Sequence, residues 1–164
     1  MPKKSSKEPE INFIGLDAKK SKDLAKQLNV LLANFQVYYQ NLRGLHWNIK
    51  GSSFFELHAK FEELYTDANM KVDEIAERIL TLGEVPLHTF QDYLDTSDIK
   101  PGKKISGEKE SVSLVVKNLS TLLKIERKAI SHAGDLGDEG TVDLLSSMIS
   151  EQEKTVWMLT SYLK

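Results

Sequence analysis

The sequence predicts an all-α fold built as a bundle of four long helices, and three observations support this. Apolar residues recur in steps of three and four over several long segments, which is the period of an amphipathic helix. A long stretch rich in turn-forming residues, 83–107, separates two of these segments from the other two. The chain shows no alternating strand pattern, no internal repeat and no glycine-rich phosphate-binding motif.

The first two predicted helices are long and are joined by a short turn. The first begins near Leu16 and keeps its apolar spacing as far as Leu45. Gly51 to Ser53 interrupt the pattern, and Ser53 with Glu56 matches a capping box that starts the next helix. No glycine or proline interrupts the second helix before Gly83, so it spans residues 53–82 and is about 45 Å long.

The remaining helices follow a long connection. Residues 83–107 contain Pro86 and Pro101 and are predicted to form a crossover with a short helix at Thr89–Leu94. A third long helix ends at a loop over residues 134–140, and a fourth runs from about Thr141 to Tyr162. A single long connection between the second and third helices is the ferritin-like connectivity of a bundle. We therefore expect a flexible tail over residues 1–12 and a ferritin-like four-helix bundle domain over residues 13–164.

Composition excludes several classes of protein. The 164 residues carry 22 basic and 24 acidic side chains, which gives a formal net charge of −2. This balance argues against a surface devoted entirely to nucleic acid or membrane lipid. The absence of cysteine excludes disulfides, thiolate zinc sites and cysteine nucleophiles. No apolar run is long enough to span a membrane or resembles a signal peptide, so we expect a cytoplasmic protein.

Two histidines flank the turn between the first two predicted helices. His46 and His58 are each six residues from Ser52, at the centre of the turn. Residues equidistant from the turn of an antiparallel helical hairpin lie at the same height. The two imidazoles are therefore expected to face each other or a shared partner.

Three carboxylates follow His58 on nearly the same face of the second helix. Glu62 lies one turn beyond His58. Asp73 follows 11 residues after Glu62, which is about 20° away from the same helix face, and Glu77 lies one turn further on. A stripe of imidazole and carboxylate groups suits iron, manganese or zinc.

The stripe is too long for one metal ion to be held within one chain. His58 and Asp73 are separated by about 22 Å along the helix axis. Antiparallel pairing of two subunits would place the early group of one chain against the late group of its mate, creating two identical sites. An ordinary solvated helix face remains the alternative at this stage. The chain has no Glu-x-x-His pair, so an intrasubunit di-iron centre is not expected.

Five segments match the motifs of a known family. They are LHWNIKG at 45–51, FFELH at 54–58, DEIAER at 73–78, GEVP at 83–86 and EKTVWML at 153–159. These segments resemble the Dps family, mini-ferritins named as DNA-binding proteins from starved cells. The resemblance covers nearly the whole chain from about Leu16.

The resemblance implies an iron-storing ferroxidase that acts in oxidative stress. It implies a hollow dodecamer that oxidises Fe(II) at inter-subunit sites, typically with hydrogen peroxide, and stores ferric mineral. By position, His46, His58, Asp73 and Glu77 fall on the family's catalytic metal ligands. The family usually has Asp where this chain has Glu62, which leaves open whether a site holds one iron or two. Zinc and manganese are alternative occupants of the same site.

Two further groups of residues have competing interpretations. Trp47 is a candidate redox residue because it follows His46, but a packing aromatic at an interface is the preferred interpretation. The resemblance implies that acidic residues near the start of the last helix line an iron-uptake pore, whereas acids at a helix N-terminus also complement the helix dipole. These acidic residues are Asp135, Asp138, Glu139 and Asp143.

The main competing function is that of a nucleoid-associated DNA-protecting protein with secondary iron chemistry. Its candidate contact is the N-terminal tail, where Lys3, Lys4 and Lys7 oppose Glu8 and Glu10. The surplus of one positive side chain disfavours DNA as a partner. A shell protein that has lost its metal site is a third hypothesis, which the intact ligand set opposes. We expect His88 and His132 at the surface and Trp157 in the core or an interface.

Overall fold

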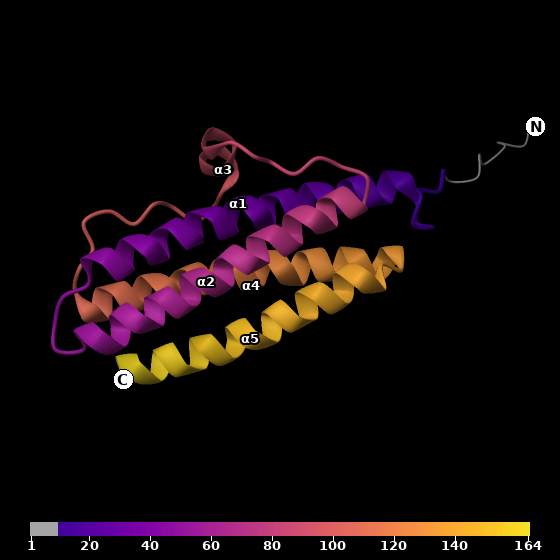
Figure 1. The fold of residues 1–164 in the computed structure, drawn as a ribbon. Helices are drawn as coiled ribbons and strands as arrows, with labels where there is room; N and C mark the ends of the chain where they lie inside the picture. Colours follow the sequence, from indigo (N-terminus) through magenta and orange to yellow (C-terminus); the bar gives the residue numbers. More distant parts are fainter. Residues whose placement is uncertain (1–9) are drawn as a thin grey trace, which may run out of the picture.

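The computed structural model describes residues 10–164, in which the regular secondary structure is helical, with one isolated β-bridge between Ile11 and Asp17. The long helices lie lengthwise beside one another, and a short helix lies outside them (Figure 1). The predicted all-α four-helix bundle with a short helix in its crossover is confirmed. The helices are α1 (Ala18–Asn48), α2 (Phe54–Thr81), α3 (Phe90–Thr96), α4 (Glu108–Leu136) and α5 (Glu139–Leu163).

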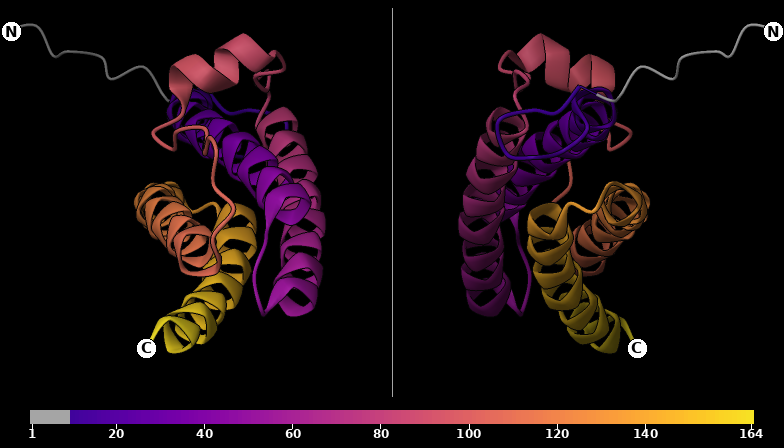
Figure 2. Two further views of the ribbon diagram at one scale, coloured as in Figure 1. Left: turned by 90° about the vertical axis from the view of Figure 1, so that its left-hand side faces the viewer. Right: turned by 90° about the vertical axis from the view of Figure 1, so that its right-hand side faces the viewer.

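The bundle consists of two helical hairpins packed against each other. α1 pairs with α2 and α4 pairs with α5, and Figure 2 shows the two pairs around a common core with α3 above α1. α1 packs against α2, α3 and α4, so its predicted apolar positions are buried almost without exception. Large side chains from all four helices fill the core, among them Phe35, Phe61, Ile75, Leu119, Leu122 and Leu145.

The crossover is held to α1 by buried asparagines. The carboxamide oxygen of Asn34 accepts hydrogen bonds from the backbone N–H groups of Asp98 (3.1 Å) and Ile99 (3.0 Å). Asn41 accepts from the backbone N–H of Gly102 at 2.7 Å. Burying an amide is costly unless its hydrogen bonds are made, and the crossover backbone supplies them.

The start of α2 differs from the sequence prediction in its capping partner. Ser53 is the N-cap residue, but its side chain makes no capping hydrogen bond, so the predicted capping box with Glu56 is wrong. The backbone N–H of Ser53 donates instead to the carboxylate of Glu108 (2.5 Å), the first residue of α4. A tertiary contact thus satisfies a donor that a local contact was expected to satisfy.

The connection between α4 and α5 is shorter than the predicted loop over residues 134–140. α4 continues to Leu136 and ends at Gly137, whose φ of +74° is the left-handed conformation that favours glycine at a helix C-terminus. Asp138 follows at once as the N-cap of α5, accepting a hydrogen bond from the backbone N–H of Thr141 at 3.0 Å. Most of the expected loop is therefore helix.

The predicted N-terminal tail lies mostly outside the described residues, which begin at Glu10. Glu10 accepts a backbone hydrogen bond from Ala18 (2.7 Å), and the Asn12 side chain accepts one from the backbone N–H of Leu16 (2.9 Å). These residues form a turn that leads into α1. Among the described residues, no helix combines the length and apolar character that crossing a membrane requires.

Candidate metal centre

His46 and His58 form a reciprocal pair across the α1–α2 turn. The Nδ1 atom of His46 lies 2.8 Å from the backbone carbonyl oxygen of His58, and the Nδ1 atom of His58 lies 2.8 Å from that of His46. The rings are stacked, with centroids 3.8 Å apart and an interplanar angle of 18°. The predicted meeting of these two side chains is therefore observed in the structure.

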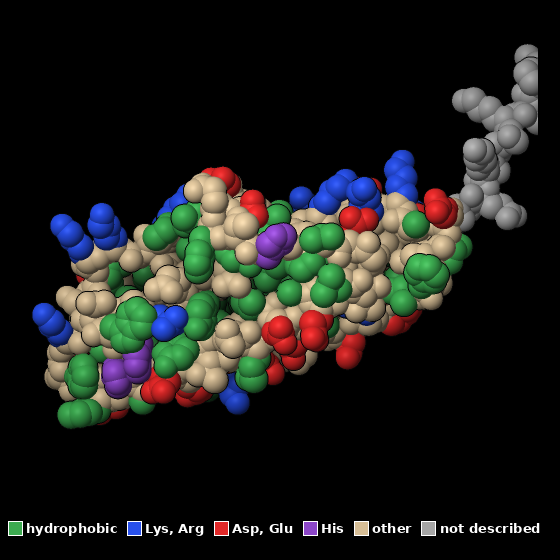
Figure 3. All heavy atoms as spheres, turned by 45° about the horizontal axis from the view of Figure 1, so that its top comes forward, with side chains coloured by type: hydrophobic (Ala, Val, Ile, Leu, Met, Phe, Trp, Pro, Cys, Tyr) green, Lys and Arg blue, Asp and Glu red, His purple; other side chains and the backbone are tan. Residues whose placement is uncertain are grey.

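This pairing defines which ring nitrogens can bind a metal. A carbonyl oxygen only accepts hydrogen bonds, so Nδ1 carries the proton in each ring. The Nε2 atom of each neutral imidazole then presents a lone pair. Orientation of a ligating histidine by a carbonyl at its other nitrogen is typical of metal sites in proteins. Both side chains are half-buried, and Figure 3 shows histidine side chains among hydrophobic ones at the end of the bundle that contains this turn.

Aromatic side chains surround the histidine pair. Phe54 stacks on His58 at a centroid distance of 5.1 Å, and Tyr65 lies edge-on to His46 at 5.4 Å. The sequence analysis did not identify Tyr65, although it lies seven residues after His58 and therefore on nearly the same face of α2. These contacts fix the ring orientations without using the Nε2 atoms.

Trp47 faces solvent rather than the core. It is 58% exposed, and the guanidinium of Arg43 lies over its ring at 4.7 Å from the centroid. This is a cation–π contact on the surface of α1. Its exposure agrees with a packing role at an interface, which stays a prediction, as does the redox role.

The three carboxylates of the predicted stripe all lie on α2 and are exposed. Glu62, Asp73 and Glu77 accept no side-chain hydrogen bond and form no ion pair among the described residues. Within the described chain, no three His, Asp or Glu side chains come together in a group that could hold a metal ion. One subunit therefore presents two separated sets of donors rather than one complete site.

The acidic residues at the α4–α5 connection have different surroundings. Asp138 is 2% exposed, forms an ion pair with Arg78 and accepts a hydrogen bond from the Thr141 hydroxyl. Its carboxylate is thus engaged within the subunit. Three other acidic side chains of this region are exposed, namely Asp135, Glu139 and Asp143.

The other two histidines and Trp157 have surroundings different from those of the histidine pair. His88 is exposed in the crossover, while His132 is half-buried and lies 2.8 Å from the carboxamide nitrogen of Gln27. Trp157 is 65% exposed on α5, so this subunit by itself does not bury it in the core.

The chain is similar to known proteins along nearly its whole length. A family model described as Ferritin-like domain matches residues 25–164. An uncharacterised protein of Haemophilus influenzae is 51% identical over 145 residues, covering 88% of this chain and 91% of that protein. The DNA protection during starvation protein of Porphyromonas gingivalis is 43% identical over 152 residues, covering 93% and 96% of the two chains.

Solved structures of related proteins show the same similarity. The Dps protein of Vibrio cholerae O1, described as a member of a broad superfamily of ferritin-like diiron-carboxylate proteins, matches with a TM-score of 0.92. It is 52% identical and covers 94% of this chain and 97% of its own. Dps from Staphylococcus aureus matches with a TM-score of 0.84 at 38% identity, covering 87% and 96%. From its helical connectivity, its histidine pair and these similarities, the chain belongs to the Dps family of ferritin-like proteins.

Proposed function

We propose that this protein is a cytoplasmic ferroxidase and iron store of the Dps type, with Fe(II) as its substrate. The reciprocal histidine pair is the observation that carries the proposal. It presents two Nε2 lone pairs at the end of α2 that also carries Glu62, an exposed carboxylate one turn beyond His58. Neutral nitrogen and anionic oxygen donors together suit iron, and also zinc or manganese when iron is scarce.

The site requires a second subunit. His58 and Asp73 are about 22 Å apart along α2, so Asp73 and Glu77 serve the histidines of a mate rather than their own. A two-fold, antiparallel arrangement of two α2 helices supplies both halves and creates two equivalent sites. We extend this arrangement to a hollow dodecamer with metal sites at the two-fold interfaces.

The donor set explains the direction of the chemistry. Carboxylates stabilise Fe(III) more than Fe(II), because the higher charge gains more from anionic ligands. Hydrogen peroxide would accept one electron from each of two Fe(II) ions and, with two protons, leave as two water molecules. Repulsion among Glu62, Asp73 and Glu77 in the assembled site would be relieved when a cation binds.

Exposed carboxylates provide a route for the substrate. We assign the iron-uptake pore to Asp135, Glu139 and Asp143, with Asp138 holding the start of α5 in place. α2 carries seven acidic side chains and three basic ones, whereas α1 carries one acidic side chain and five basic ones. Fe(II) is therefore attracted to the α2 side of the subunit.

The deciding experiment is stopped-flow oxidation of Fe(II) by hydrogen peroxide and, separately, by oxygen. The double variant His46→Ala with His58→Ala should keep its assembled mass and lose rapid oxidation with either oxidant. The exposed histidine variant His88→Ala serves as the matched control and should retain the full rate. Full oxidation by the double variant would refute the assignment.

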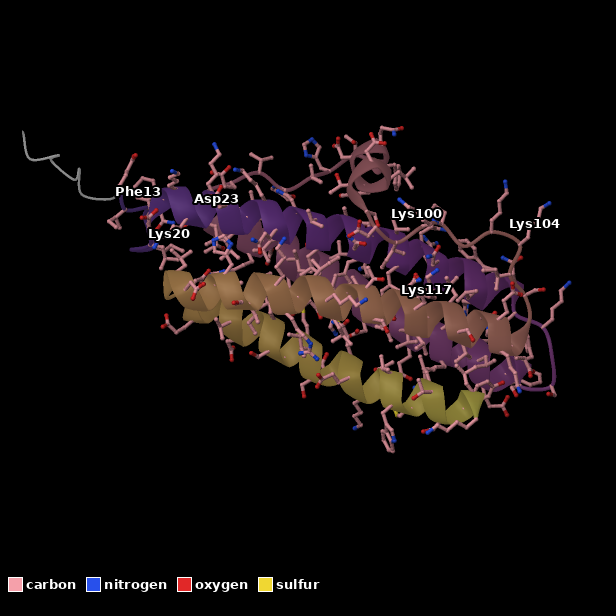
Figure 4. The ribbon with its side chains drawn as sticks, turned by 180° about the vertical axis from the view of Figure 1, so that it is seen from behind. Phe13, Lys20, Asp23, Lys100, Lys104 and Lys117 are labelled. Atoms are coloured by element: carbon pink, nitrogen blue, oxygen red, sulfur yellow. The ribbon has the colours of Figure 1, made fainter. Side chains whose placement is uncertain are left out.

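DNA binding is the second candidate function, favoured by lysines outside the tail. Lys100, Lys104 and Lys117 are exposed on the crossover and α4, and Figure 4 shows them toward the same end of the bundle. None of the three forms an ion pair among the described residues. Gel shifts at two salt concentrations should compare the full chain, a chain lacking residues 1–10, and a Lys100→Gln, Lys104→Gln, Lys117→Gln variant. Absence of any shift at low salt would exclude this function.

A further inference from the structure

A carboxyl group and a carboxamide group meet in the core between α4 and α5. Glu126 of α4 is 0% exposed and Gln152 of α5 is 4% exposed. The Gln152 Nε2 group donates a hydrogen bond to Glu126 Oε1. The remaining oxygen of each group, Glu126 Oε2 and Gln152 Oε1, is buried and has no hydrogen-bond partner among the described residues. One donor thus serves a site that contains three acceptor atoms.

A single proton completes this arrangement. With Glu126 ionised, two buried oxygens on adjoining groups lack donors, and each such unpartnered atom destabilises the folded state. A proton on Glu126 Oε2 turns that atom into a donor. The O–H can then bond to Gln152 Oε1, which closes a ring of two hydrogen bonds between a neutral acid and an amide. Both unpartnered atoms are satisfied by the same proton.

We propose that Glu126 and Gln152 form a buried proton-binding site, in which the neutral acid links α5 to α4 by two hydrogen bonds and deprotonation removes one of them. Burial raises the pKa of Glu126 to about 7 from an ordinary value of 4.5. The hydrogen bond from Gln152 and the positive charges of Lys71 and Arg127 act to lower this pKa, but the effect of burial is larger.

The neighbouring lysine has carboxylate partners of its own. Lys71 of α2 is 4% exposed and forms ion pairs with Asp67 of its own helix and with Glu151 of α5. Two carboxylates thus share one ammonium group, and Lys71 has no hydrogen bond to Glu126. A proton is therefore the charge that neutralises Glu126.

The remaining charged and titratable groups of this region supply no better partner for the Glu126 carboxylate. Arg127, next in sequence on α4, is exposed and forms an ion pair with Glu153. On α1, the buried phenol of Tyr38 has a pKa raised by burial and by the charge of Asp67, the carboxylate that also pairs with Lys71. Tyr38 is therefore neutral wherever Glu126 titrates, so the titration is assigned to Glu126 alone.

The linkage between this proton and folding has a defined sign. The unfolded chain releases the proton near pH 4.5, whereas the folded subunit retains it up to about pH 7. Stabilisation of the fold by this proton is fully present below the pKa that Glu126 has in the unfolded chain. It is lost as the pH rises through the pKa that Glu126 has in the folded subunit. Between these limits this group alone should raise the unfolding equilibrium constant roughly tenfold per pH unit.

The test uses a variant that keeps the ring of hydrogen bonds without a titratable proton. Glu126→Gln places two carboxamides face to face, and these can form two hydrogen bonds at any pH. Urea unfolding of the full chain should give similar stability for both proteins near pH 4.5 and greater stability for the variant at pH 8. Glu110→Gln, the same change at an exposed site on α4, should keep the pH dependence of the parent.

Infrared spectroscopy provides a readout that does not depend on folding of the variant. At pH 6 the parent protein should show the carbonyl band of a protonated carboxylic acid in a buried environment, and raising the pH to 8 should remove it. Glu126→Gln should lack the band at both values. The proposal is overturned if the parent shows no such band at pH 6. It is also overturned if the ratio of the unfolding equilibrium constants of Glu126→Gln and the parent is the same at every pH.

Discussion

Arg78, near the end of α2, forms an ion pair with Asp138, the buried residue that begins α5. The Nε atom of the same guanidinium donates a hydrogen bond to the Thr141 hydroxyl at 2.9 Å. The helix that carries the candidate ligand Glu77 is thereby joined to the acidic region assigned to iron uptake. Arg78 directly follows Glu77, so this contact also fixes the end of α2 on which that ligand lies.

The contact predicts that two neighbouring acidic residues behave differently when neutralised. Asp138→Asn removes the charge that pairs with a largely buried arginine, so the free energy of unfolding should fall by about 1–3 kcal/mol. Asp143→Asn changes an exposed carboxylate without a partner among the described residues and should stay within about 0.5 kcal/mol. Urea unfolding of both variants measures the difference. Equal destabilisation would contradict the distinction, and unchanged iron uptake by Asp143→Asn would remove it from the pore.

A site shared between subunits predicts complementation between two inactive proteins. One variant carries His46→Ala and His58→Ala, and the other carries Asp73→Asn and Glu77→Gln. A mixed pair contains one intact site and one site lacking all four groups, so random co-assembly at equal amounts should recover about one quarter of the parent's Fe(II) oxidation rate. Each variant assembled alone is the control. No recovery in verified mixed shells would show that each chain uses its own residues.

Glu62 and its neighbour Glu63 provide a matched pair for testing the fifth ligand. Glu62→Gln should lower the rate of Fe(II) oxidation at least about tenfold, because it removes an anionic donor close to His58. Glu63 is ion-paired with Lys60 on the surface, so Glu63→Gln should leave the rate unchanged. Stopped-flow absorbance measures both. A normal rate in Glu62→Gln would remove Glu62 from the site, and Fe(II) titration of the parent would then give the number of irons per site.

The buried amide of Asn34 predicts a localised effect on the crossover. Asn34→Leu leaves two backbone N–H groups, those of Asp98 and Ile99, without their acceptor. The free energy of unfolding should fall by about 2–4 kcal/mol, and amide hydrogen exchange should accelerate first at these two residues. Asn69→Leu, at an exposed position of α2, is the control and should leave both amides protected. Unchanged exchange in Asn34→Leu would show that α3 and its contacts hold the crossover without Asn34.

Local pattern was sufficient for the helices and for the histidine pair. The helical period places apolar residues on one face, and a short turn makes neighbouring helices antiparallel. His46 and His58 had to meet because they are equidistant from that turn. The 15-residue separation of His58 and Asp73 likewise follows from helix geometry. These features depend on residues close together in sequence or on one rigid helix.

Only the tertiary structure decided how distant polar groups are paired. Glu108 accepts a hydrogen bond from the backbone N–H of Ser53, 55 residues earlier in the sequence. Gln152 donates one to Glu126, which lies 26 residues before it. Periodicity contains no information about which buried polar groups will face each other, since that depends on the rotation and height of packed helices. For the same reason Asp138, which the sequence analysis grouped with three acidic pore residues, is buried against Arg78.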